Sequence, residues 1–177
     1  EDLYTTAGTV PAAGDATDMI EAKQAGSGTT WAGASGATPP TGWAKASWAA
    51  GTHDNTGGDY RLTHDGANNS PGVESFYTTV VGKLYELNFD VITVNGGAAY
   101  SIWVTTATGG GGTLIDGSYS SSTTVDTGLS IVFEAPTTTT YIAIQLISTT
   151  GTEYIEVDNI SLHEVTPGIV SATTAGP

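Results

Sequence analysis

The segment LYELNFDVITV, residues 84–94, alternates large apolar side chains with polar ones over most of its length. The apolar side chains that share one face are Tyr85, Leu87, Phe89 and Val91. The polar side chains between them are Glu86, Asn88 and Asp90. Because successive side chains of a β-strand point to opposite faces, this period of two predicts a half-buried antiparallel strand.

Similar extended segments occupy much of the chain on either side of this strand. They are WAKASW (43–48), DYRLTH (59–64), VESFYT (73–78), AAYSIWVTT (98–106), LSIVFEA (129–135), TYIAIQLIS (140–148) and EYIEVDNISL (153–162), with TDMIEAK (17–23) as a candidate first strand. Turn residues such as Asn95-Gly96-Gly97 separate them at short intervals, which leaves no room for helical crossovers. About eight to ten short antiparallel strands must hide their edges, so we expect a two-sheet β-sandwich, most simply a jelly roll.

The length and composition fit one such domain between two polar ends. The chain has 177 residues, of which 38% are hydrophobic, and this is enough for one sizeable core. Residues 1–16 and 165–177 are rich in Thr, Gly and Ala. We therefore expect an N-terminal arm (1–16), a sandwich domain (17–164) and a C-terminal tail (165–177); frayed ends are the alternative interpretation of both terminal segments.

The charge of the chain excludes several classes of partner. Eighteen acidic residues stand against four Lys and Arg, for a formal net charge of −14. Phosphate backbones and anionic lipids would be repelled, so neither nucleic acid nor a membrane surface is an expected partner. No run approaches the roughly 18 apolar residues of a membrane span. The absence of cysteine leaves the compartment open. Low charge and a high Thr content favour a virion surface or an extracellular location.

The order of several motifs resembles known carbohydrate-binding proteins. They are PPTGWAKASW, GGDYRLTHDG, FYTTVVGKLYELNFDV, EAPTTTTYIAIQL and TEYIEVDNISL. Together, over residues 17–164, they look like carbohydrate-binding modules of families four, nine and twenty-two, and like related jelly rolls of bacteriophage virion proteins. The resemblance implies a jelly roll that presents a surface and catalyses no reaction.

The resemblance also implies a structural calcium ion. By its pattern the ligands would be Asp158 in the last strand, Glu21 in the first strand and the neighbourhood of Asp59. Calcium prefers six to eight hard oxygen ligands, and the acidic composition suits it. The alternative for Asp158-Asn159 is a β-bulge whose side chains bond the local backbone.

Aromatic and amide side chains are the candidates for binding sugars, because aromatic rings stack on pyranose faces and amides bond hydroxyl groups. In AAYSIWVTT, Trp103 faces away from the apolar positions, and in TYIAIQLIS the same is true of Tyr141 and Gln145. Trp48 and Tyr77 complete the predicted ligand-binding set. The alternative is that each tryptophan packs beneath a loop or at an end of the sandwich.

Catalysis has little support in the sequence. His53 and His64 are each followed by Asp in segments with the composition of turns. The segment GASGA (33–37) lacks the spacing and the following helix of a nucleophile elbow. We therefore expect a non-catalytic structural module of a virion or cell surface, such as a phage decoration or fibre protein, that attaches to other subunits through its arms and also binds glycans. The alternative is a polysaccharide-binding module of a secreted enzyme.

Overall fold

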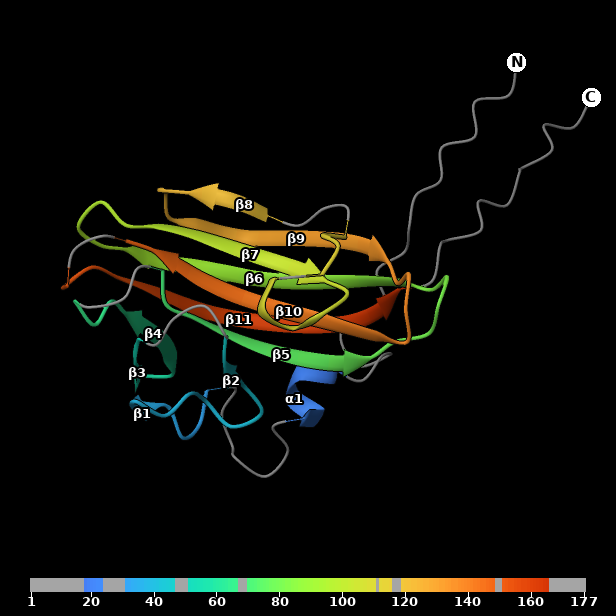
Figure 1. Ribbon diagram of the computed structural model, residues 1–177, viewed down its shortest axis with the longest axis horizontal. Helices are drawn as coiled ribbons and strands as arrows, with labels where there is room; N and C mark the ends of the chain where they lie inside the picture. The colour runs from blue at the N-terminus through green and yellow to red at the C-terminus, as the bar shows by residue number, and fades with distance from the viewer. Residues whose placement is uncertain are drawn as a thin grey trace, which may run out of the picture.

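The computed structural model describes residues 18–23, 31–46, 51–66, 70–110, 112–115, 119–148 and 151–165. These residues form two antiparallel sheets that pack face to face (Figure 1). One sheet has six strands in the order β1-β3-β4-β11-β6-β9, and the other has five in the order β2-β5-β10-β7-β8. The predicted antiparallel β-sandwich of the jelly-roll type is therefore confirmed.

The strands alternate between the two sheets along much of the chain. The six-stranded sheet contains β1 (Ser35–Gly36), β3 (Thr52–Thr56), β4 (Asp59–Thr63), β6 (Leu84–Val94), β9 (Asp126–Glu134) and β11 (Tyr154–Val165). The five-stranded sheet contains β2 (Ala44–Lys45), β5 (Gly72–Thr78), β7 (Ala99–Thr105), β8 (Tyr119–Ser122) and β10 (Thr139–Ile147). A short helix, α1 (Met19–Lys23), and one 3-10 turn, η1 (Thr108–Gly110), are the other regular elements of the described chain.

The core lies between the sheets and is built from the alternating positions that the sequence pattern predicts. The fully buried side chains of four central strands include Leu87 and Val91, Ile102 and Val104, Ile142 and Ile144, and Ile155 and Val157. Each strand therefore turns one row of side chains inward and the next outward. This parity determines which side chains are available on the outer faces. No described helix is long and apolar enough to cross a membrane.

The start of the described chain corrects one prediction. Residues 17–23 were expected to form a strand, but Met19–Lys23 is a helical turn. Asp18 explains the difference, because its Oδ1 accepts a hydrogen bond from the Ile20 amide at 2.9 Å, as an N-cap does. The same oxygen accepts a hydrogen bond from the Leu162 amide of β11 at 3.1 Å. One carboxylate thus starts the helix and ties it to the last strand.

Besides the two-residue strand β1, two strands of the structure were not expected. β3 covers residues whose composition is typical of turns. It forms a hairpin with β4 through Gly57 and Gly58, both at positive φ. Its His53 is only 1% exposed, so a histidine occupies a core position in this strand. β8 is the other addition, and it pairs with β7 at the edge of the five-stranded sheet. The predicted division into arm, domain and tail stays a prediction.

Candidate functional site

The outward face of the five-stranded sheet gathers most of the predicted sugar-binding residues. β10 lies between β5 and β7, and antiparallel register fixes which side chains are neighbours. Ala143 of β10 pairs with Glu74 of β5 and with Trp103 of β7. The next row along the strands is Phe76, Tyr141 and Thr105, and the row on the other side is Gly72, Gln145 and Ser101. Three rows of outward residues therefore define one face.

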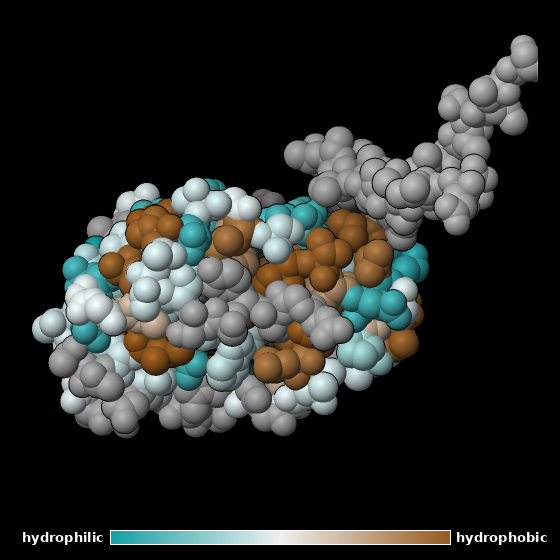
Figure 2. Space-filling view, turned by 90° about the horizontal axis from the view of Figure 1, so that it is seen from above, coloured by the Kyte–Doolittle hydropathy of each residue, from teal (hydrophilic) through white to brown (hydrophobic). Residues whose placement is uncertain are grey.

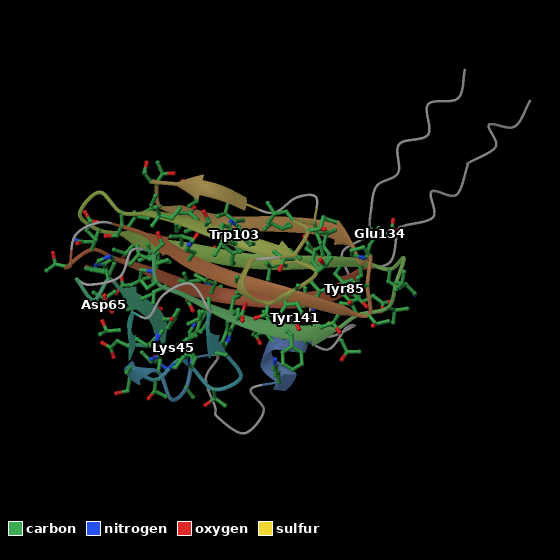
Figure 3. The ribbon with its side chains drawn as sticks, viewed as in Figure 1. Lys45, Asp65, Tyr85, Trp103, Glu134 and Tyr141 are labelled. Carbon is green, nitrogen blue, oxygen red and sulfur yellow. The ribbon has the colours of Figure 1, made fainter. Side chains whose placement is uncertain are left out.

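Trp103, Tyr141 and Gln145 share this face, as the sequence predicted. Trp103 and Tyr141 are half-buried, and Figure 3 shows them on the side of the sandwich toward the viewer. The prediction of Tyr77 as a ligand-binding residue is wrong. Tyr77 lies on the inward side of β5 and is only 4% exposed, so a ligand on this face cannot reach its ring. Burial also raises the pKa of the Tyr77 hydroxyl. Trp48 lies outside the described residues.

An aromatic residue that sequence reasoning missed is more accessible than those it found. Phe76 is 56% exposed, and its ring centroid lies 6.0 Å from that of Tyr141 at an interplanar angle of 46°. The ammonium group of Lys23 lies 3.9 Å from the Phe76 ring centroid and donates hydrogen bonds to Ser75 Oγ (2.9 Å) and the Phe76 carbonyl (2.7 Å). The alternation within VESFYT contains the necessary signal, since Phe76 and Tyr77 must face opposite sides.

A loop covers the middle of the face. We call residues 106–110 and 112–113, between β7 and the segment before β8, the tongue; it runs in front of β10 in Figure 1. Its tip is anchored on Glu74 of β5: Thr108 Oγ1 donates a hydrogen bond to Oε1, and the Gly109 amide donates one to Oε2 at 2.6 Å. Both oxygens of this carboxylate are therefore engaged by the tongue.

Beside the neck of the tongue, at the edge formed by β9, lies an apolar groove of about 590 Å³. Its lining includes Leu84, Leu114, Val132 and Pro136, with Glu134 as its charged member. Figure 2 looks onto this edge and shows hydrophobic side chains in several patches along it. The groove offers no described tryptophan or tyrosine for stacking, so it differs in character from the sheet face.

The outward face of the six-stranded sheet holds two of the three predicted calcium ligands. Burial raises the pKa of Asp59, and the negative charges of Asp158 and Glu156 raise it further, so these carboxylates interact. Burial alone would raise the pKa of Glu156, but hydrogen bonds from Thr93 and Arg61 and the charge of Arg61 lower it overall. Of Glu21, the third predicted ligand, the structure describes the backbone in α1 and not the side chain.

The predicted bulge at Asp158-Asn159 is present in the structure. The register between β11 and β6 shifts between Asp158 and Ser161, and Asn159 has a φ of 49°. Its side chain donates to Asp90 Oδ2 at 2.6 Å, across to the neighbouring strand and not to its own backbone. Within the described residues there is no group of three or more His, Cys, Asp or Glu side chains that could hold a metal ion. Calcium binding stays a prediction.

Calcium is expected to raise the melting temperature of the protein if Asp59 and Asp158 share an ion. Binding to the folded state alone stabilises it by about 2.7 kcal/mol at a calcium concentration one hundred times the Kd. Differential scanning calorimetry with calcium and with a chelator measures the shift. Asp158→Asn should remove it, while Asp54→Asn on β3 should retain it. Melting that is insensitive to the chelator would contradict the calcium site.

Comparison with solved structures shows the same fold in carbohydrate-binding modules. A module of family four superposes with a TM-score of 0.51 at 17% identity, over 71% of this chain and 96% of the module. The N-terminal cellulose-binding domain of β-1,4-glucanase C from Cellulomonas fimi gives 0.50 at 16% identity, over 75% and 93%. A putative sugar-binding protein from Bacteroides thetaiotaomicron gives 0.51 at 11% identity, over 84% and 100%.

The chain thus has the jelly-roll fold of carbohydrate-binding modules, and the resemblance predicted from its sequence motifs is confirmed at the level of the fold. No protein-family model and no curated protein matches its sequence. At these low identities the likeness concerns the fold alone. What the chain binds therefore depends on its own surface residues.

Proposed function

We propose that this protein is a non-catalytic module that binds glycans on the outward face of its five-stranded sheet. The observation that carries the proposal is the pair of neighbouring rings of Phe76 and Tyr141 on the outward face, with Trp103 half-buried on the same face. Aromatic rings provide stacking surfaces for sugar rings.

The electrostatics of the face favour an uncharged glycan and argue against catalysis. With a net charge of −14 the protein repels polyanions, including uronic or sulfated polysaccharides. Glu74 is the carboxylate in the central row, and both of its oxygens accept hydrogen bonds from the tongue. It is therefore engaged in holding a loop and is a poor candidate for general acid or base chemistry.

Removing single aromatic rings tests the proposal. We expect Tyr141→Ala and Phe76→Ala each to weaken binding of a glycan at least tenfold, about 1.4 kcal/mol, because each removes a stacking surface. The wild type is first screened on an array of neutral plant, fungal and bacterial oligosaccharides, and affinities are then measured by titration calorimetry.

The matched control is Val132→Ala, which removes an exposed apolar side chain from the outward face of β9 in the other sheet. It should leave the affinity unchanged. The proposal fails if no neutral glycan binds, or if both aromatic variants bind as tightly as the wild type.

A second candidate function is attachment to a larger assembly, as the terminal segments predicted. Its support is that Asp18, at the first described residue, bonds the Leu162 amide near the end of β11. The described chain therefore begins beside the last strand, so that segments attached at either end would start from neighbouring positions. We propose a virion or extracellular surface as the location. Analytical ultracentrifugation of the full chain tests self-assembly; a monomer at every concentration would leave attachment to a different protein as the remaining form of this candidate.

A further inference from the structure

The position of the tongue limits how a glycan can reach the aromatic face. The tongue leaves β7 directly after Thr105, and its tip is bonded to Glu74 on β5. β10 lies between these two strands, so the tongue must cross it. It therefore runs across the strands, between the row that contains Phe76 and Tyr141 and the row that contains Gln145.

Burial confirms that the tongue closes the centre of the face. Ala143 points outward from β10, yet it is 2% exposed, and Thr105 and Glu74 on the flanking strands are 1% and 9% exposed. Outward side chains of a half-covered sheet are normally open to water. By contrast Phe76, one row away from Glu74 on the same strand, is 56% exposed. The accessible platform is thus a bay beside the tongue and not the whole face.

The bay is bounded on two sides. The tongue forms one side, and its root closes the bay at β7, where Thr105 Oγ1 donates to the Ala107 carbonyl at 2.7 Å. Its opposite end, at β5, is flanked by the Lys23 ammonium, which retains one N–H beyond its two hydrogen bonds. A bay closed at one end accepts the end of a chain but not a segment from its middle.

The neck of the tongue is held closed by a close approach. The Thr106 amide donates to the Thr113 carbonyl at 3.2 Å, and the Thr113 amide to Thr106 Oγ1 at 3.1 Å. A Cβ placed on Gly112 would lie 2.4 Å from the Ala107 nitrogen, so only glycine fits at this position. Glu74 at the tip and Gly112 at the neck therefore offer two independent ways to displace the same loop.

We propose that the tongue restricts this face to the ends of uncharged glycan chains, and that Glu74 is the positioning residue that determines this specificity by holding the tongue across β10. The inference rests on the proposed function. It goes beyond it by naming the ligand class as chain termini. The wild type should gain little affinity as an oligosaccharide is lengthened, because further sugars project past the closed bay.

The experiment uses the full chain with cellohexaose, laminarihexaose, mannohexaose and xylohexaose, their trisaccharides and the corresponding soluble polymers. For a glycan that binds, we expect trisaccharide and hexasaccharide to agree within about twofold and calorimetry to give about one protein per polymer chain. In Glu74→Gln and Gly112→Ala, the number of proteins bound per polymer chain should rise several-fold. Hydrogen exchange of the tongue should also accelerate. Glu134→Gln, a carboxylate substitution on β9, should change neither.

Each other outcome is decisive. Many wild-type molecules on one polymer chain would overturn the inference while leaving the proposed function intact. The same holds if Glu74→Gln frees the tongue in hydrogen exchange but the stoichiometry stays unchanged. Binding only in Glu74→Gln would show that the tongue excludes glycans altogether, which also contradicts selection of chain ends. If neither the wild type nor any variant binds a probe, the proposed function fails and the inference falls with it.

Discussion

Replacing Trp31 with alanine is expected to lower the free energy of unfolding by about 3–5 kcal/mol. The Trp31 ring is fully buried and lies 4.9 Å from the Tyr60 ring and 5.6 Å from the Trp43 ring, centroid to centroid. Its Nε1 has no hydrogen-bond partner among the described residues, so the loss reflects packing and the cavity left behind. Because most domains are stable by only about 5–15 kcal/mol, the effect should dominate urea unfolding curves.

Circular dichroism should follow this transition, since the substitution removes a fluorophore. The control is Trp103→Ala, which removes the same side chain from a half-buried outward position and should cost less than half as much. A shift of the midpoint at constant slope would identify a change in stability of the folded state. A loss below 1 kcal/mol for Trp31→Ala would show that this aromatic cluster contributes little to the core.

Acidification is expected to destabilise the protein through His53. Burial, with a smaller effect from the positive charge of Lys45, lowers the pKa of His53 to about 4. Nδ1 lies 2.7 Å from the Tyr60 hydroxyl, and Nε2 has no partner among the described residues, so an added proton would be poorly solvated. The unfolded chain takes up this proton near the ordinary pKa of about 6.5.

Between these two pKa values only the unfolded state is protonated at His53, so stability falls as the pH falls from about 6.5 to 4. The slope from this one group approaches 1.4 kcal/mol per pH unit, and it vanishes above and below that window. Chemical unfolding at several pH values measures it. Because acidic residues titrate in the same range, the informative quantity is the difference between the wild type and His53→Gln. Parallel pH profiles of the two proteins would refute the assignment.

The sequence predicts the central strands well because their pattern is local. Residues 84–94 form β6 with the expected limits, since one outward polar residue follows each inward apolar one. α1 and β3 could not be obtained in this way. The helical turn depends on Asp18 reaching the Leu162 amide, 144 residues away, and β3 depends on the burial of His53 against Tyr60. Tertiary contacts determine both elements, and they leave no periodic pattern in the sequence.

The same limit applies to the site. Alternation alone places Trp103, Tyr141 and Gln145 on one face, because it needs only the parity of each strand. The prediction of Tyr77 as a ligand residue was wrong because Tyr77 points inward and Phe76 outward. The alternation of this strand is hard to recognise, since its outward positions also include the buried Glu74. The role of Glu74 itself could not be predicted, because it depends on a hydrogen bond to a glycine-rich loop 35 residues further along the chain.

The single carboxylate that joins Asp18 to Leu162 has a consequence for how such a sandwich can be used in a larger architecture. Its first and last described elements are neighbours, so the polypeptide enters and leaves the fold at almost the same point. A domain whose ends lie close together can be inserted into a loop of a host protein without distorting the host. Because Lys23 of α1 lies against Phe76, the aromatic bay would then sit close to the point of insertion.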